Sequence, residues 1–271
     1  MPADAESFVV QLDGQAATQA DLAPLAFAGY AHFTALQVRD RRVRGLDLHL
    51  RRLRTASQTL FGQALPDEEI RARLRAAIQA GPADQSLTAT LYSPAGEFTV
   101  AGPDARPRVL VRTGPPAGGP AGALALATVA HERLVPAVKH VGEAAKTYYL
   151  RQAAEAGYDD VAFVDRQGRL SEASIWNLAF WDGEAVVWPE ADMLIGTTMG
   201  MVQRQLARMG VPQRTRPIAP ADVAGLQGAA VMNSWTPGIA VSRVADIALP
   251  PAHAFIERLH RAYQAEPLAD V

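Results

Sequence analysis

The sequence of 271 residues contains no cysteine, and this absence excludes several kinds of site. A chain without thiols forms no disulfide, has no thiolate nucleophile and offers zinc no cysteine ligand. Long apolar runs are also missing, since no stretch approaches the roughly 18 apolar residues of a membrane-spanning helix. The amino terminus has neither a charged start nor a long apolar segment. We therefore expect no signal peptide and a cytoplasmic protein.

A strong excess of either charge is missing as well. The chain has 26 basic and 28 acidic residues, a net charge of −2, and no basic stripe. Nucleic acid and membrane surfaces are therefore not expected partners. The hydrophobic content of 49% supplies ample material for a core. The length predicts one large or two medium domains, since typical domains have roughly 100–200 residues.

Lysine is the scarcest charged residue. Only Lys139 and Lys146 are lysines, and the other 24 basic residues are arginine. A guanidinium stays protonated, whereas a partly desolvated lysine amine can lose its proton and condense with a carbonyl group. Lys146 falls on a predicted helix two turns after Lys139, and we expect it to be a solvated surface charge. Lys139 follows the apolar run LVPAV and is the better candidate for chemistry.

The hydrophobic pattern predicts a mixed α/β protein. In the first half it predicts strands at 8–14, 32–40, 86–93, 97–102 and 108–113, and helices at 46–61 and 67–80. The stretch GPPAGGPAG at 114–122 is too rich in glycine and proline for regular structure. We place a domain boundary there, which gives domains of residues 1–117 and 118–271.

The second half is predicted to be rich in hairpins. The pattern indicates strands at 123–129, 229–234 and 244–249, hairpins within 161–173 and 177–188, and helices at 144–156, 197–210 and around Phe255 to Tyr263. Asp182–Gly183 is a dipeptide favoured in tight hairpin turns. Thr198 is a candidate helix cap.

Several well-known catalytic motifs are absent. The sequence has no GxSxG, HExxH or GxxxxGK[ST] segment. His253 and His260 are seven residues apart on the last predicted helix, a spacing that indicates a solvated face more often than a metal site. The other histidines do not cluster with acids at ligand spacing, so we expect no metal.

A lysine, an acid and groups that can bind an anion occur in the remaining sequence. Lys139 precedes Glu172, with a predicted helix and a hairpin strand between them. An enzyme that uses pyridoxal phosphate needs an amine for the aldehyde, a carboxylate beside the pyridine nitrogen and donors for the phosphate. Arg52 and the helix start at Gly196 to Thr198 could supply those donors. From spacing alone, a residue such as Glu172 is more often an exposed hairpin charge.

From Lys139 to Thr198 the chain resembles the class IV aminotransferase family of pyridoxal phosphate enzymes. This family includes branched-chain aminotransferases, D-amino acid aminotransferases and aminodeoxychorismate lyases. The matching segments are VKHVG, AGYDDVAFVDRQGRLSEASIWN and LIGTT, in family order. HFTALQVRDRRVRGLDLHLRRL resembles the family segment in which a strand leads into an HxxRL helix. The resemblance covers most of the chain, is weakest between Gly81 and Ala123, and implies a two-domain α/β fold and a homodimer.

The resemblance implies roles for three residues around the cofactor ring. Lys139, which falls in the second predicted domain, corresponds to the lysine that forms the Schiff base and then moves the substrate proton. Glu172, in LSEASIWN, corresponds to the acid that pairs with the pyridine nitrogen. Asn177 corresponds to an asparagine that supports the same site.

The resemblance also implies a phosphate site. Arg52 corresponds to the phosphate-binding arginine, since the HxxRL pattern favours it over its neighbour Arg51. Other phosphate contacts are implied for Thr197 and Thr198 at a helix start, and for Ser234 and Thr236 in NSWTPGI. Trp235 in that turn replaces a smaller residue of the family.

Three departures from the family pattern concern the substrate side. Branched-chain enzymes carry a tyrosine five residues after the lysine, and this chain has Ala144. Their Phe-Glu pair is Phe33–Thr34 here, which is more similar to the lyases, as is the histidine that follows Lys139. The arginine-glycine pair that holds a substrate carboxylate in many aminotransferases has no counterpart in LYSPAGEF.

Without that clamp, Tyr30, His32, Arg39 and Tyr92 are the alternatives for holding the substrate carboxylate. Phe33, Tyr30 and Tyr92 are the predicted substrate-binding residues.

Three functions remain open at the level of sequence. The first is transfer of an amino group between an amino acid or amine and a keto acid, with small molecules as partners. The second is a carbon–carbon lyase on the same scaffold, which would cleave aminodeoxychorismate to 4-aminobenzoate and pyruvate. The third is a binding or scaffold protein without catalysis. The presence of Lys139, Glu172 and Arg52 together argues against the third.

Overall fold

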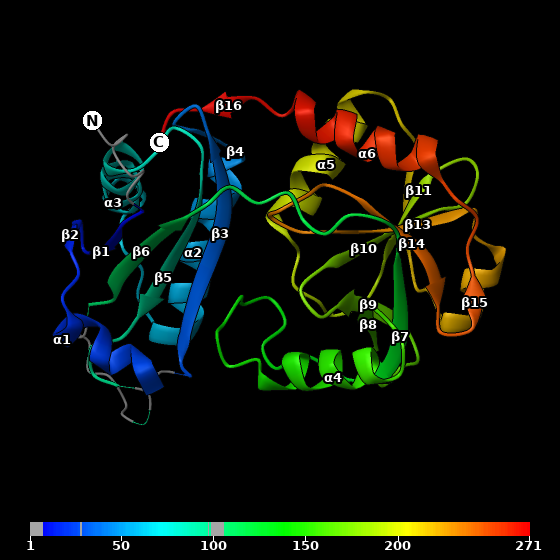
Figure 1. The fold of residues 1–271 in the computed structure, drawn as a ribbon, viewed down its shortest axis with the longest axis horizontal. Coiled ribbons are helices and arrows are strands. Elements are labelled where there is room, and N and C mark those ends of the chain that lie inside the picture. The colour runs from blue at the N-terminus through cyan, green and yellow to red at the C-terminus, as the bar shows by residue number, and fades with distance from the viewer. Residues whose placement is uncertain (1–7, 28, 97, 99–105) are drawn as a thin grey trace, which may run out of the picture. The chain divides into compact units, whose positions relative to one another are not determined.

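The computed structural model describes residues 8–27, 29–96, 98 and 106–271. The chain divides into two compact units, whose elements are labelled in Figure 1. Unit 1 contains the described residues of Met1–Ala117 together with Val138–Gly142 and Pro267–Val271. Unit 2 contains Gly118–Ala137 and Glu143–Glu266. The predicted domains had a single boundary and placed Lys139 in the second domain. In the structure Lys139 belongs to unit 1, because its backbone pairs with a strand of that unit.

Unit 1 is built on an antiparallel seven-stranded sheet with the order β16–β4–β3–β5–β6–β1–β2. The strands are Val10–Leu12 (β1), Gln15–Ala16 (β2), Ala31–Arg39 (β3), Arg42–Arg44 (β4), Gln85–Tyr92 (β5), Arg108–Gly114 (β6) and Leu268–Ala269 (β16). The helices are Gln19–Leu22 (α1), Ala23–Phe27 (η1), Leu46–Phe61 (α2) and Asp67–Ala80 (α3). The predicted strand at 97–102 falls mostly outside the described residues.

Helix α2 forms where the sequence predicted it. Leu46, Leu50 and Leu53 recur at helical spacing and are buried. The helix begins after Gly45 and ends at Gly62, and both glycines adopt the left-handed backbone conformation, with φ of 62° and 70°. Glycine adopts that conformation without the strain that a Cβ atom would introduce. The described helix α2 therefore has the predicted bounds.

The sheet of unit 1 has one face covered by helices. Leu36 and Val38 of β3 belong to a core cluster that also contains residues of α2, α3, β5 and β6. Because side chains alternate along a strand, Phe33 and Gln37 lie on the opposite face, where they are only partly buried. The strand thus presents one face to the core and leaves Phe33 on the other.

Unit 2 is a nine-stranded sheet in which six strands close into a ring. The ring order is β10–β13–β14–β7–β8–β9, and β9 returns to pair with β10. These strands are Leu124–Ala130 (β7), Asp160–Val164 (β8), Leu170–Ala173 (β9), Asn177–Trp181 (β10), Gly228–Met232 (β13) and Ile239–Val244 (β14). Val186–Pro189 (β11), Gln213–Arg216 (β12) and Ile247–Ala248 (β15) extend it. The ring closes where Glu172 of β9 lies opposite Asn177 of β10.

Helices cover the strands of unit 2 on two sides. Ala144–Glu155 (α4) lies on one side of the strands, and Thr197–Arg208 (α5) and His253–Ala265 (α6) lie on the other (Figure 1). A short helix, Pro220–Gly225 (η2), precedes β13. Ala153 of α4 packs with Val161 and Phe163 of β8, so α4 is fixed on the strand that leads towards Glu172.

Two details differ from the sequence predictions. The segment 244–249 is not one strand, because the chain turns at Ala245, which has a φ of 48°. Helix α5 begins at Thr197 with Gly196 as its cap residue, so Thr198 is inside the first turn and is not the cap. The hairpin turn at Asp182–Gly183 is confirmed, with a φ of 102° at Gly183.

Candidate functional site

Lys139 lies on a short segment that extends the sheet of unit 1. The Phe33 amide donates a hydrogen bond to the Lys139 carbonyl at 2.9 Å, and the Val141 amide donates one to the Ala31 carbonyl at 2.9 Å. The Lys139 side chain is partly buried, and its Nζ lies 4.8 Å from the centre of the Phe33 ring. The backbone on both sides of Lys139 is therefore fixed to β3, and Phe33 covers its amine.

The HxxRL segment on α2 has a structural histidine and a partly buried arginine. Thr34 Oγ1 and the buried His49 Nδ1 share a hydrogen bond of 2.6 Å, which ties α2 to β3. Burial, and next the positive charge of Arg52, lower the pKa of His49 to about 3, so His49 is neutral. Arg52 is partly buried and Arg51 is exposed. This difference in burial agrees with Arg52, rather than Arg51, as the candidate for an anion contact.

The predicted substrate-binding residues of unit 1 differ in exposure. Tyr30 is 45% exposed, and its hydroxyl donates to the Leu60 carbonyl at 2.8 Å. Tyr92 is buried in a cluster with Leu12 and Ala31, and Phe33 lies beside Lys139. Of the three predicted substrate-binding residues, Phe33 is therefore the one with a contact to the Lys139 amine.

The two basic alternatives for a carboxylate clamp, His32 and Arg39, both make hydrogen bonds within unit 1. His32 is fully buried, its Nε2 shares a hydrogen bond of 2.8 Å with Ser57 Oγ, and burial lowers its pKa to about 4. The ring is therefore neutral and does not supply the positive charge that a carboxylate would need. Arg39 donates to the Val38 carbonyl at 2.8 Å and to Gln37 Oε1 at 3.1 Å.

Glu172 of unit 2 is buried among charged groups. Lys146 Nζ lies 3.0 Å from Glu172 Oε1, and the Arg133 guanidinium lies 3.7 Å from the same oxygen. Arg133 also pairs with Glu143 at 3.1 Å. We call these four residues the Glu172 cluster. The expectation that Glu172 could be an exposed hairpin charge is wrong, because β9 is covered on both faces.

The prediction that Lys146 is a solvated surface charge is also wrong. Lys146 is only 8% exposed, since it lies on the buried face of α4 seven residues before the buried Ala153. Burial lowers the pKa of Lys146, while the negative charge of Glu172 opposes that shift. The helical spacing to Ala153 was a signal in the sequence that could have indicated this burial. Arg133 and Glu143 carried no comparable signal, because they lie outside helices and strands.

Asn177 connects Glu172 to the start of α5. It lies opposite Glu172 in the strand register, and its Nδ2 donates to the Leu194 carbonyl at 2.7 Å. A Cβ atom on Gly196 would overlap Asn177 Oδ1, so residue 196 has no room for a side chain. The asparagine and the glycine therefore fix the approach of the chain to α5.

The start of α5 offers amide groups without a side-chain cap. Helix α5 has 12 residues, and no side chain caps its first turn. The first amides of a helix have no partner within the helix, and they carry the positive end of its dipole. Thr197 and Thr198 are buried in this turn. Such a helix start binds anions, including phosphate groups.

The two residues of the predicted second phosphate turn, Thr236 and Ser234, differ in burial. Thr236 is buried, and its Oγ1 accepts a hydrogen bond of 3.4 Å from the Gly238 amide. Ser234 is partly buried. Trp235 is 42% exposed and meets the Trp176 ring edge-on, with 5.8 Å between ring centres.

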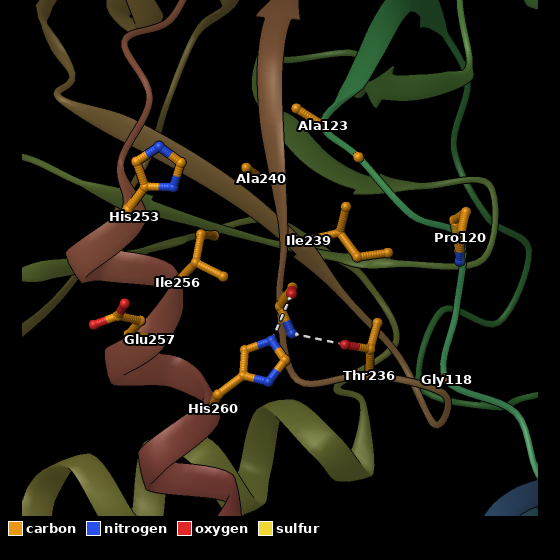
Figure 2. A pocket seen from close by; sticks show the side chains of 12 residues that line it. Gly118, Pro120, Ala123, Thr236, Ile239, Ala240, His253, Ile256, Glu257 and His260 are labelled. Atoms are coloured by element: carbon orange, nitrogen blue, oxygen red, sulfur yellow. Dashed lines mark hydrogen bonds between the residues drawn. The ribbon is translucent and has the colours of Figure 1, made fainter.

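A cavity of about 460 Å³ in unit 2 lies beside α6 and β14, and its lining includes Thr236. Figure 2 shows His253, Ile256, Glu257 and His260 of α6 along its wall. His260 Nε2 donates to the Gly238 carbonyl at 2.8 Å. Glu172, Asn177, Thr197 and Thr198 do not line the cavity, so it is separate from the Glu172 cluster.

Neither a group of metal ligands nor a membrane-spanning helix occurs among the described residues. No three histidine, aspartate or glutamate side chains among residues 8–27, 29–96, 98 and 106–271 form a group that could hold a metal ion. Over the same residues, no helix combines the length and the apolar character that crossing a membrane requires.

The candidate residues fall into two groups, each described within its own unit. Unit 1 brings Lys139 and Phe33 together, with Arg52 placed on α2. Unit 2 brings Glu172 and Asn177 together and links them to the start of α5. The first group offers an amine, and the second offers a buried carboxylate and a helix start that can bind an anion.

Comparison with known proteins identifies one family and a shared fold. The family described as Amino-transferase class IV matches residues 31–244. No curated protein matches the sequence. The matched range includes Lys139, strand β9 with Glu172 and the start of α5.

Solved structures show the same fold at low sequence identity. A branched-chain aminotransferase from Thermoproteus uzoniensis has a TM-score of 0.83 at 16% identity, over 95% of this chain and 94% of its own. A 4-amino-4-deoxychorismate lyase candidate from Legionella pneumophila has a TM-score of 0.78 at 16% identity, over 88% and 92%. The T.th. branched-chain amino acid aminotransferase, solved in complex with N-(5'-phosphopyridoxyl)-L-glutamate, has a TM-score of 0.80 at 16% identity, over 96% and 93%.

Proposed function

Because the chain belongs to the class IV aminotransferase family, we propose that it is a pyridoxal 5'-phosphate-dependent aminotransferase. It would transfer an amino group between an amino acid or amine and a keto acid. A structural neighbour from the same fold holds a phosphopyridoxyl compound, which supports the choice of cofactor. A homodimer and a cytoplasmic location are proposed with it, on the family resemblance and the composition.

The observation that carries the proposal is the buried carboxylate of Glu172 beside a glycine-restricted helix start. Glu172 is 4% exposed, and none of the described residues donates a hydrogen bond to its Oε2. A Cβ atom on Gly196 would overlap Asn177 Oδ1, and α5 follows without a side-chain cap. A cationic ring nitrogen suits the first feature, and a phosphate suits the second. The residues of unit 2 therefore fit both ends of this cofactor.

When bound, pyridoxal phosphate supplies an aldehyde and a ring that withdraws electrons from the substrate's α-carbon. Lys139 provides the amine proposed to hold the cofactor covalently and then to move the proton at that carbon. Phe33 covers the amine on one side and excludes water there. Arg52 is proposed as a phosphate-binding residue of unit 1. In unit 2 the start of α5, Ser234 and Thr236 are proposed as phosphate contacts.

The lyase remains a second candidate. A lyase candidate is among the similar structures, and residue 144 is alanine where the branched-chain enzymes have tyrosine. The Phe33–Thr34 pair carries less weight than the sequence indicated. Thr34 faces the helices and bonds to His49, so its role in the structure is to anchor α2.

Borohydride trapping tests the proposed lysine. The protein is incubated with pyridoxal phosphate, reduced and digested, and the labelled peptide is identified by mass spectrometry. The chain has only two lysines, so the label distinguishes Lys139 from Lys146 without ambiguity. We expect the label on Lys139 in the wild-type protein and no label after Lys139→Arg. A label on Lys146 alone, or no label in the wild type, would refute the assignment.

An acceptor requirement separates the two reactions. Amino donors are offered with and without keto acids, and aminodeoxychorismate is offered alone. The aminotransferase is expected to stop after one turnover when no keto acid is present. Continuous release of 4-aminobenzoate and pyruvate without a keto acid would instead establish the lyase.

A further inference from the structure

The Glu172 cluster contains more charge than pairing with a cofactor requires. It holds two cations, Lys146 and Arg133, and two carboxylates, Glu143 and Glu172. The side chains of Lys146, Arg133 and Glu172 are each less than a tenth exposed. Removing ions from water carries a desolvation penalty that their attraction does not always offset. Stability alone is therefore a weak explanation for a lysine at this position.

Both cations lie beside the same oxygen of the Glu172 carboxylate. Lys146 Nζ and the Arg133 guanidinium lie 3.0 Å and 3.7 Å from Oε1. Within the described residues no hydrogen bond reaches Oε2. One oxygen is thus held by the protein, and the other remains for an additional donor.

The elements that carry these groups fix the arrangement. Glu172 is on β9 and faces Asn177 across the closing pair of the ring, so its backbone cannot shift along the strand without breaking the register. Lys146 is on α4, which packs on β8 through Ala153. The Lys146 amine also lies 5.8 Å from the Phe163 ring of β8. A lysine with contacts on two strands has little freedom to move away from Glu172.

We propose that Lys146 is a positioning residue that, with Arg133, holds Glu172 as a carboxylate through Oε1 and leaves Oε2 for the cofactor's ring nitrogen. This inference rests on the proposed function. It assigns Lys146 a role that differs from that of Lys139, since its amine acts on the acid and not on the aldehyde.

The charged and titratable groups around Glu172 determine what its loss should do. Lys146 faces it from α4, Arg133 and His131 from the segment after β7, and Glu143 from the residue before α4. Burial lowers the pKa of His131, so that ring adds no cation at neutral pH. Without Lys146, the buried carboxylate would keep Arg133 alone as a cation, so its charged form would lose part of its electrostatic support. A falling pH would then weaken the pairing between this acid and a protonated ring nitrogen more than it does in the wild type.

The experiment compares two probes that need no Schiff base. Pyridoxamine 5'-phosphate carries the ring nitrogen, and its 1-deaza analogue has a CH group in its place. Their affinities for the full-length protein are measured between about pH 6 and about pH 8, a range below the titration of free lysine. The ratio of the two affinities reports the contact between the ring nitrogen and Glu172 alone.

In the wild type we expect a preference for the nitrogen compound that stays constant over this range. In Lys146→Met the preference should decrease as the pH falls, by about tenfold or more between about pH 8 and about pH 6. Lys146→Gln should behave as Lys146→Met does, and it keeps a donor in the same space in case the methionine variant does not fold. Lys146→Arg should restore the constant preference. Arg151→Met, which removes an exposed cation from the same helix, is the matched control and should match the wild type.

The outcomes separate this inference from the proposed function. A wild-type protein that binds neither phosphate compound would refute the cofactor, and the inference with it. A wild type that prefers the nitrogen compound, with the same constant preference in both neutral variants, would refute only the role of Lys146. A lower melting temperature in the variants with an unchanged ratio would also count against it, since a purely structural ion pair gives that result.

Discussion

The two units bury polar groups in opposite ways. Unit 1 buries neutral imidazoles against hydroxyl groups, in the pairs His32–Ser57 and His49–Thr34. Unit 2 buries ions, and its Glu172 cluster places a lysine and an arginine around one carboxylate. A buried neutral pair satisfies its hydrogen bonds without desolvating a charge, whereas a buried ion loses its hydration. The neutral pairs of unit 1 therefore serve the fold, and the ionic cluster of unit 2 indicates a site with a chemical task.

The same contrast applies to the two lysines. Lys139 lies partly buried at the edge of the unit 1 sheet, against an aromatic ring. Lys146 lies buried within an ion cluster of unit 2. Both have the same amine, so their surroundings must determine whether they serve as nucleophile or counter-ion.

Neutralising the acid of the ionic cluster is expected to have the largest effect. Glu172→Gln removes the charge that would keep a ring nitrogen protonated, so turnover should fall by about a hundredfold or more while the cofactor still binds. Turnover and cofactor content are measured on the same preparation. Glu155→Gln, on the exposed surface of α4, is the control. Wild-type turnover in Glu172→Gln would show that the ionic cluster of unit 2 has no role in catalysis.

Removing Arg52 should have a smaller effect and act on affinity. Arg52→Ala would delete the proposed charge-assisted hydrogen bond to phosphate. Such a bond contributes about 1.5–3 kcal/mol, so we expect roughly a 10- to 150-fold loss of cofactor affinity. The fold should persist, because Arg52 is only partly buried. Arg51→Ala, one residue earlier and exposed, should leave the affinity unchanged. Equal affinities in the two variants would show that the arginine was misassigned.

The smallest expected effect is a loss of stability at low pH, caused by the buried neutral histidines of unit 1. His32 and His49 have pKa values near 4 and 3 in the folded state, below the ordinary value of 6.5. The unfolded chain therefore binds more protons than the folded chain between these values. The free energy of unfolding should be highest above about pH 6.5 and fall by about 1.4 kcal/mol per pH unit for each histidine as the pH decreases.

Hydrogen exchange of α2 amides between about pH 6.5 and about pH 5.5 measures this dependence above most of the carboxylate range. His32→Gln keeps a partner for Ser57 and removes one imidazole, so its dependence on pH should be weaker. If α2 protection, corrected for intrinsic exchange, is independent of pH, the imidazoles are not the buried neutral groups described here.

Local pattern was enough to predict the elements that carry the site. The bounds of α2 followed from leucines at helical spacing and a terminal glycine, and the hairpin turn at Gly183 from its preceding aspartate. These features depend on residues close in sequence, so no knowledge of packing was needed. The prediction of a single strand at 244–249 was wrong. The chain turns at Ala245 in the left-handed conformation, which alanine rarely adopts, so no signal in the sequence marked the turn.

The surroundings of the candidate residues could not be predicted in the same way. The sequence pointed to Glu172 through family resemblance, but it gave no reason to place Arg133 beside it. Lys146 was expected in solvent because most lysines are solvated surface charges, yet it is buried on α4. Whether a lysine on this helix is buried depends on the strand beneath it, which is set by tertiary packing.

The order of residues along the chain by itself determined the family, the secondary structure and which side chains are chemically able to act. Only tertiary structure decided that a lysine and an arginine far apart in the chain share one carboxylate oxygen, and that the segment of Lys139 joins the sheet of unit 1. The physical reason is that chemical identity and periodicity are local properties. Burial and the distance between charges depend on which strands pair and which helix covers them.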